Sequence, residues 1–278
     1  MIKFVIYTGK IGMDNNAVKK KHKRKPLTKV NMLHYFRLFL RSAIWIYLIV
    51  KYIIYRVHGG TDIGTFFYTT PALMIAIYAV FVLEMIMRFF PSNLESPGCQ
   101  KQFRRNYIKT GNTNIDVQDN NAVVLVAIIW VALNGIFGFL RLTGVFDDGI
   151  MILICGAYAV SDIICILFFC PFQSWFLKNK CCCSCRIYNW DYAMMFTPIV
   201  FVQNIKFWYL WILLVMSIML AVRWEVTFFL HPERFAESTN AYLSCSNCTE
   251  KLCMHKNQLK SLWKHISEYS QERVRRLK

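Results

Sequence analysis

The residues of this chain that are best suited to chemistry are cysteines, gathered in two short clusters. Cys182 and Cys185 form one Cys-x-x-Cys pair, and Cys245 and Cys248 form a second. Four thiolates can complete a tetrahedral Zn²⁺ site, because a Cys-x-x-Cys turn presents two sulfur atoms to the same side of an ion. The two pairs therefore predict a zinc site, provided that the fold brings them together.

Further ligands and other cysteine chemistries remain open beside this prediction. Cys253 and His255 follow the second pair, and either can replace one sulfur ligand. An iron–sulfur cluster also uses four cysteines and is the alternative cofactor. Cysteines beside a membrane are targets of palmitoylation. If the second cluster instead faced an oxidising compartment, its cysteines would form disulfides.

A second set of notable residues lies inside apolar stretches. Asp162, Asn134 and Glu84 each occur where an exposed polar side chain would face hydrocarbon, so they must face the interior of a bundle. One interpretation is a relay for protons or cations. The other is helix packing, with Asp162 hydrogen-bonded to Asn134 or Tyr158 and Glu84 paired with Arg88 one helical turn away. We favour packing, because one acidic residue at mid-membrane is thin support for transport.

The apolar stretches that carry these residues define the fold class. Hydrophobic residues make up 56% of the chain, and several runs reach the roughly 20 residues that cross a bilayer. We expect an all-α integral membrane protein, a polytopic helical bundle of about six membrane segments. They are expected at 36–56, 66–90, 122–142, 150–170, 192–202 and 207–230, with 192–202 short or re-entrant. The bundle, 36–230, separates a basic tail, 1–35, from a basic, cysteine-containing tail, 231–278.

The net charge of +17 is best explained by Lys and Arg residues that orient the protein in a cell membrane. Lys and Arg are concentrated in both tails and in the loops 92–121 and 171–191, whereas the links 58–64 and 143–149 contain none. The positive-inside rule then places the N-terminus in the cytoplasm and, with six crossings, the C-terminus as well. Five crossings with an external C-terminus is the competing topology.

The basic residues also indicate which partners to expect. They attract anionic lipid headgroups, and Arg41 and Lys51 near the ends of the first segment can reach the interface. The segment 256–278 has an apolar stripe opposite a basic face, which predicts an amphipathic helix on the cytoplasmic membrane surface. Nucleic-acid binding is not expected, because no aromatic residues interleave with the basic run 19–25.

These patterns favour a non-enzymatic membrane protein with a cytoplasmic, cysteine-rich metal site that serves assembly, or interaction with protein partners or with copies of itself. Two alternatives stay open. One is a small transporter or channel that uses Asp162, Asn134 and Glu84, and the other is a membrane redox protein that uses the Cys-x-x-Cys pairs. No zinc-protease, serine-hydrolase or phosphate-loop motif occurs, so no particular reaction is indicated.

Overall fold

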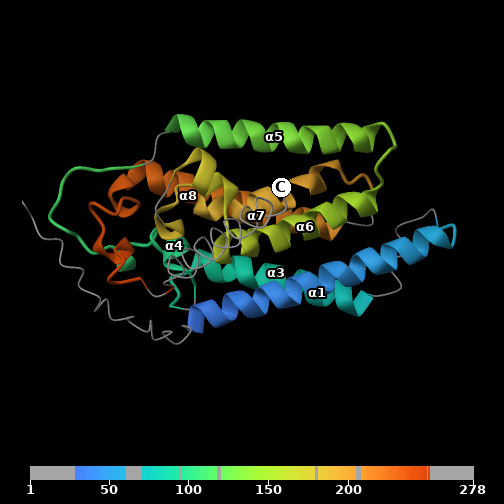
Figure 1. The fold of residues 1–278 in the computed structure, drawn as a ribbon, viewed down its shortest axis with the longest axis horizontal. Helices are drawn as coiled ribbons and strands as arrows, with labels where there is room; N and C mark the ends of the chain where they lie inside the picture. The colour runs from blue at the N-terminus through green and yellow to red at the C-terminus, as the bar shows by residue number, and fades with distance from the viewer. Residues whose placement is uncertain are drawn as a thin grey trace, which may run out of the picture.

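The computed structural model describes residues 29–60, 71–93, 95–117, 120–178, 181–204, 208–248 and 250. Within these residues the protein is helical, and an isolated bridge between Lys109 and Asn240 is its only β-type pairing. Long helices run side by side along the molecule (Figure 1). They are α1 (Lys29–Val57), α3 (Pro71–Phe89), α5 (Asn120–Leu142), α6 (Asp148–Leu167) and α8 (Trp208–Leu230).

The surface of this bundle is that of a membrane protein. Four of the helices, α1, α5, α6 and α8, are long and apolar enough to cross a membrane. Large apolar side chains such as Phe39, Val131 and Phe139 are exposed on them. A contiguous apolar surface of this kind is rare on soluble proteins. In a bilayer it contacts hydrocarbon, while each helix satisfies its own backbone hydrogen bonds.

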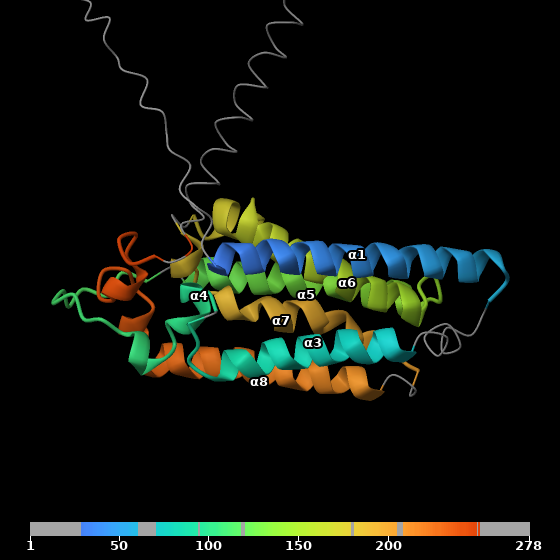
Figure 2. The ribbon, with the colours of Figure 1, turned by 90° about the horizontal axis from the view of Figure 1, so that it is seen from below.

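A shorter segment lies between the long helices. It consists of α7 (Asp191–Phe196) followed by the 3₁₀ turn η5 (Thr197–Phe201). Pro198 lacks the N–H that would continue the α-helical ladder, so the backbone tightens into a 3₁₀ turn there. Figure 2 shows α7 between α6 and the pair formed by α3 and α8.

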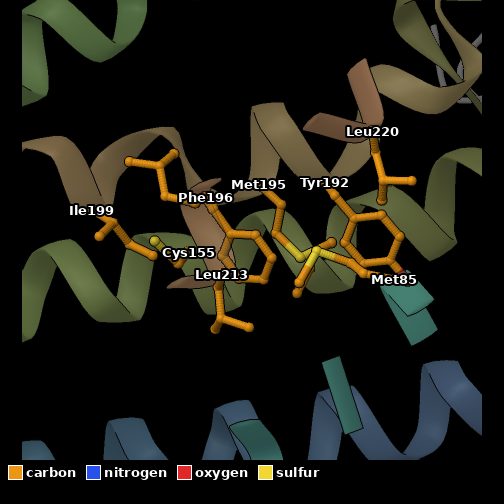
Figure 3. Close-up of a cluster of buried hydrophobic side chains, with 10 residues drawn as sticks. Met85, Cys155, Tyr192, Met195, Phe196, Ile199, Leu213 and Leu220 are labelled. Atoms are coloured by element: carbon orange, nitrogen blue, oxygen red, sulfur yellow. The ribbon is translucent and has the colours of Figure 1, made fainter. Parts of the chain in front are cut away.

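The apolar core forms around this short segment. The buried residues of the short segment pack against side chains from α3, α6 and α8 (Figure 3). The labelled members of this cluster are Met85, Cys155, Tyr192, Met195, Phe196, Ile199, Leu213 and Leu220. The segment is thus part of the bundle interior rather than a surface loop.

The two ends of the short segment are attached at opposite ends of the bundle. At the first end, Arg88 at the end of α3 donates to Asp191 at 2.5 Å. At the second end, the backbone N–H groups of Gln203 and Asn204 donate to the Asp148 carboxylate at the start of α6, at 3.2 and 3.0 Å. We name the first the cysteine end, because the segment 181–190, α4 (Pro97–Gln100) and residues 231–248 gather there.

Helices occupy the positions at which membrane segments were expected. The largest difference is at α1, which begins at Lys29 rather than near residue 36, because Asn31 and His34 are buried against the bundle. Several predictions lie outside the described residues, namely those for the start of the second segment at 66–70, the basic run 19–25, Cys253, His255 and the tail helix 256–278.

Candidate functional site

Charged side chains form a continuous chain of ion pairs inside the bundle, at its cysteine end. In order, the chain runs Asp162, Arg41, Glu84, Arg37, Glu95, Arg88 and Asp191. Charges of opposite sign alternate throughout. The nitrogen–oxygen distances run from 2.5 Å between Arg41 and Glu84 to 3.9 Å between Arg88 and Glu95. We call these seven residues the charge chain.

The charge chain joins elements that are far apart in the sequence. Arg37 and Arg41 lie on one face of α1, and both contact Glu84 of α3. The hydroxyl of Tyr192 in α7 also donates to Glu84, at 3.0 Å. Buried charges are tolerated only when paired and hydrogen-bonded, so these contacts fix how α1, α3 and α7 pack.

Two expectations about these residues are wrong. Glu84 pairs with the arginines of α1 rather than with Arg88, whose partner is Asp191. Arg41 is buried in the bundle rather than extended to the membrane interface. The reason is the same in both cases: Glu84 is already neutralised from the neighbouring helix, which leaves Arg88 free to bind α7.

Asp162 and Asn134 both face the bundle, but they do not bind each other. The Asp162 carboxylate is 3.4 Å from Arg41, and its side chain is 15% exposed. Asn134 is buried and donates to the backbone carbonyl of Trp130 in its own helix, at 2.9 Å. A guanidinium neutralises a buried carboxylate and an amide does not, so the contact with α1 prevails over the expected one with α5.

A cavity of about 140 Å³ lies where the charge chain ends. Asp162 and Asp191, the two terminal members of the chain, both line it. Aromatic rings from α5 and α6 line it too, and the rings of Trp130 and Tyr158 are 4.5 Å apart between centroids. The remaining walls include the thiols of Cys165, Cys170, Cys182 and Cys185.

Successive cysteines of the first cluster face different surroundings, because residues 182–184 form the 3₁₀ turn η3 (Cys182–Ser184). The Cys182 thiol turns toward the cavity and donates to the Gln173 side chain at 3.0 Å. The Cys183 thiol turns away from it and is hydrogen-bonded to the thiols of Cys181 and Cys248. These bonds, together with burial, raise the pKa of Cys183 well above its usual value.

Cys181, Cys183 and Cys248, which we call the thiol cluster, therefore combine residues of both sequence clusters. Glu250 adjoins them, with its carboxylate 3.7 Å from the Cys183 sulfur. The other oxygen of that carboxylate is 3.4 Å from His34 of α1. The thiol cluster thus lies where the start of the C-terminal tail meets α1.

A completely buried lysine, Lys101, lies next to the backbone of the first cysteine cluster. The Lys101 ammonium donates to the backbone carbonyls of Cys183 and Cys185, at 3.0 and 2.8 Å. The rings of Trp224 and Phe235 flank it at 5.3 and 5.4 Å. Among the described residues, no carboxylate forms an ion pair with it. Burial lowers the pKa of Lys101 to about 8, and the neighbouring thiols partly oppose that shift.

The two Cys-x-x-Cys pairs do not form the four-sulfur group that their spacing predicts. Cys182 and Cys185 line the cavity, Cys245 is exposed, and Cys248 contacts Cys183. In the part of the chain that the structure describes, no three His, Cys, Asp or Glu side chains are arranged to hold a metal ion. Zinc and iron–sulfur binding therefore stay predictions.

Sequence reasoning missed several residues of this site. Nothing in a lone lysine of a basic loop signals that Lys101 is buried. The two arginines of α1 did carry a signal: Arg37 and Arg41 are spaced by one helical turn at the start of a membrane segment, which places both charges on one face.

Comparison of the chain with protein-family models, with curated proteins and with solved structures finds no match. Its function is therefore argued from the contacts described above.

Proposed function

We propose that this is a six-crossing protein of the cell membrane whose cytoplasmic end holds one zinc-like cation on the thiol cluster. Cys181, Cys183 and Cys248 supply three thiolates, and Cys253 or His255 supplies the fourth ligand. The bound cation attaches the C-terminal tail to the bundle, so that bundle and tail form one platform for assembly or interaction.

The observation that carries this proposal is the environment of Lys101. A buried ammonium group without a counter-ion is strongly unfavourable. The thiols of Cys181, Cys183 and Cys185 can become anionic, and all three interact electrostatically with Lys101. A Zn²⁺ ion bound by three or four thiolates carries a net negative charge, and this charge would balance the lysine. Lys101 thus favours a thiolate complex over three neutral thiols.

The positions of the ligands also support the proposal. The Cys183 thiol already contacts those of Cys181 and Cys248, and a ZnS₄ tetrahedron requires sulfur atoms about 4 Å apart. Metal binding then needs rearrangement within the cluster rather than a change of fold. Cys253 is five residues beyond Cys248, and an extended chain of that length reaches about 17 Å. That distance is enough to return a fourth ligand to the cluster.

The length of the short segment supports a sixth crossing. Six α-helical residues, five 3₁₀ residues and three extended residues together span about 29 Å. This length matches the roughly 30 Å hydrocarbon core. Segment 191–204 then crosses between α6 and α8, which makes the number of crossings even. The distribution of Lys and Arg supports a cytoplasmic location for the cysteine end and both termini.

Reporter fusions test this topology. A reporter inserted after Lys178 should respond as cytoplasmic, and the same reporter inserted after Asn204 should respond as external. If both positions respond as cytoplasmic, segment 191–204 re-enters instead of crossing, and the C-terminal tail is external.

Metal analysis tests the cation site itself. Protein purified in detergent should contain about one zinc per chain and no visible chromophore, whereas an iron–sulfur cluster would absorb visible light. Cys183→Ser should remove most of the zinc. Lys101→Met, which keeps an apolar stem between the two rings, should weaken its retention. Cys245→Ser is the matched control, since Cys245 is exposed, and it should leave the zinc content unchanged.

Two results would contradict the proposal. Equal zinc content in Cys183→Ser and in the unmodified protein would exclude the thiol cluster as the site. Loss of zinc from Cys245→Ser, with Cys183→Ser unaffected, would restore the original pairing of Cys-x-x-Cys motifs.

The two alternatives have less support in the described contacts. Glu84, assigned to a relay by the transporter interpretation, is held by two arginines and a tyrosine hydroxyl. The redox interpretation needs the paired thiols of each Cys-x-x-Cys motif to act together, but Cys245 and Cys248 have different surroundings.

A further inference from the structure

The charge chain is unbalanced by one negative charge. It contains four carboxylates and only three arginines, and both of its ends are carboxylates. His34 also interacts electrostatically with Asp162, but it is engaged with Glu250. No other described ion pair supplies the missing positive charge. An uncompensated carboxylate in a bundle interior is costly, so the imbalance points to an absent cation.

The two ends of the chain meet in one place. Asp162 and Asp191 both line the cavity between α5, α6 and α7, and they repel each other electrostatically. A cation placed between them would be the eighth member of the chain and would close it into a ring of alternating charges. We propose that this cavity binds a small organic cation, whose ammonium group lies between Asp162 and Asp191.

The two carboxylates have unequal roles in this site. Asp191 already accepts two contacts from Arg88, at 2.7 and 2.5 Å, and one from the backbone of Tyr192. Within the described residues, the ion pair of Asp162 is a 3.4 Å contact to Arg41, which itself binds Glu84 at the shorter distance of 2.5 Å. Asp162 is therefore the principal anchor, and Asp191 adds a second acceptor.

The walls of the cavity favour an organic cation over a metal ion. The volume of about 140 Å³ exceeds what a single ion occupies, since a water molecule takes about 30 Å³ of liquid. Aromatic faces such as those of Trp130 and Tyr158 attract alkylammonium groups and also bury their carbon atoms. No three described ligand-type side chains converge as a metal requires.

Ser161 lies at the boundary of the cavity, because it lines the cavity and is also exposed on the outer surface of α6. In a bilayer, an amine with an apolar body would approach the site from the membrane at this position. The site does not depend on the proposed metal centre, because the thiol cluster and Lys101 are absent from its lining. Failure of one proposal therefore leaves the other standing, provided that the binding measurement uses protein with its metal content intact.

Calorimetric titration of the detergent-purified protein with benzylamine tests the site, with benzyl alcohol as the neutral molecule of the same shape. Benzylamine should bind saturably, and benzyl alcohol should give only the heat seen with empty micelles. Asp162→Asn should weaken benzylamine binding at least tenfold. Ser161→Trp fills the mouth without touching the charge chain and should abolish binding. Ile164→Trp, one turn further along the same exposed face of α6 but absent from the cavity lining, is the control and should bind normally.

Several outcomes would overturn the proposal. They are the absence of saturable benzylamine binding, equal binding of the alcohol, undiminished binding by Ser161→Trp, and displacement of benzylamine by sodium or zinc at lower concentration. If Asp162→Asn fails to fold, the pair Ser161→Trp and Ile164→Trp decides the question, because neither alters a charge.

Discussion

Lys101 is the charged side chain on which the proposed metal site depends most directly. It is held between two aromatic rings and two backbone carbonyls, with thiols as its nearest electrostatic partners. A basic loop next to predicted membrane segments is expected to hold solvated lysines, so only the folded arrangement distinguishes Lys101 from Arg104 and Arg105.

The buried lysine predicts how stability depends on pH in the metal-free protein. Burial lowers the pKa of Lys101 from its usual 10.5 to about 8. Above pH 8 the unfolded chain keeps a proton on this lysine that the folded protein has lost, so the contribution of Lys101 to the free energy of unfolding should rise with pH, by at most about 1.4 kcal/mol per pH unit. The pKa values of Cys99, Cys183 and Cys185 are raised by burial and hydrogen bonding, that of Cys185 to about 12. Unfolded thiols ionise from about pH 8, so these cysteines give the opposite slope over the same range.

Denaturation of the chelator-treated protein at pH 7, 8 and 9 measures this effect. Because the cysteines are common to both proteins, the stability of the unmodified protein relative to Lys101→Met should rise between pH 8 and 9. Identical pH profiles for the two proteins would show that Lys101 is not buried as a charge.

The Glu84 carboxylate binds Arg37, Arg41 and the hydroxyl of Tyr192, so its negative charge should contribute to the stability of the fold. Glu84→Gln leaves Arg37 and Arg41 without their shared carboxylate and should destabilise the protein by about 3 kcal/mol or more. The matched control is Glu237→Gln, because Glu237 is exposed, and its effect should stay within about 0.5 kcal/mol. Thermal unfolding in detergent compares the two variants. Equal unfolding midpoints would contradict the pairing of Glu84 with Arg37 and Arg41.

For individual residues, the sequence predicted which polar side chains are buried better than it predicted which residues they contact. That Asp162, Asn134 and Glu84 avoid lipid follows from the energetics of polar groups in hydrocarbon. The partners depend on which helices are neighbours, and that information is not local. Likewise, Cys-x-x-Cys spacing indicated Cys182 and Cys185, whereas the 3₁₀ turn directs Cys183 toward Cys248.

Among the elements, α7 with η5 has the most unusual position, since it is short and yet surrounded by the long helices. Pro198 and the polar residues that follow Val202 made a short segment predictable. Its attachment at both ends was not predictable, because it rests on Arg88 and Asp148, which are distant in sequence.

Two glycines of α5 test where η5 packs. A β-carbon added at Gly138 would lie 2.3 Å from the Phe201 ring, whereas one added at Gly135 would meet nothing within 4 Å. Gly135→Ala should therefore stabilise the protein by up to about 1 kcal/mol, the usual gain in helix propensity. Gly138→Ala should destabilise it by about 1 to 3 kcal/mol through overpacking. Equal shifts in unfolding midpoint would mean that η5 does not contact α5 there.

The molecule concentrates its buried charges at the cysteine end, whereas the opposite end has the contacts of Asp147 and Asp148. The long helices could be predicted because apolar runs of membrane length are a strong signal. The approach of the C-terminal tail to α1, through Glu250 and His34, could not be predicted from either segment alone.

Limited proteolysis tests whether metal holds the tail to the bundle. Chelator treatment should speed trypsin cleavage after Lys256 and Lys260 several-fold, because removal of the cation would detach the tail from the thiol cluster. Cys183→Ser should be cleaved rapidly with or without chelator, and Cys245→Ser should behave like the unmodified protein. Chelator-independent cleavage of the unmodified protein would separate the tail from the metal site.

The central claim, a cation held by thiolates of both cysteine clusters, is tested most directly by X-ray absorption at the zinc edge of the purified protein. We predict three or four sulfur neighbours at about 2.3 Å, with at most one nitrogen at about 2.0 Å. Cys248→Ser should lower the number of sulfur neighbours by one or abolish zinc binding. A spectrum with only nitrogen and oxygen neighbours, or one that Cys248→Ser leaves unchanged, would contradict the account.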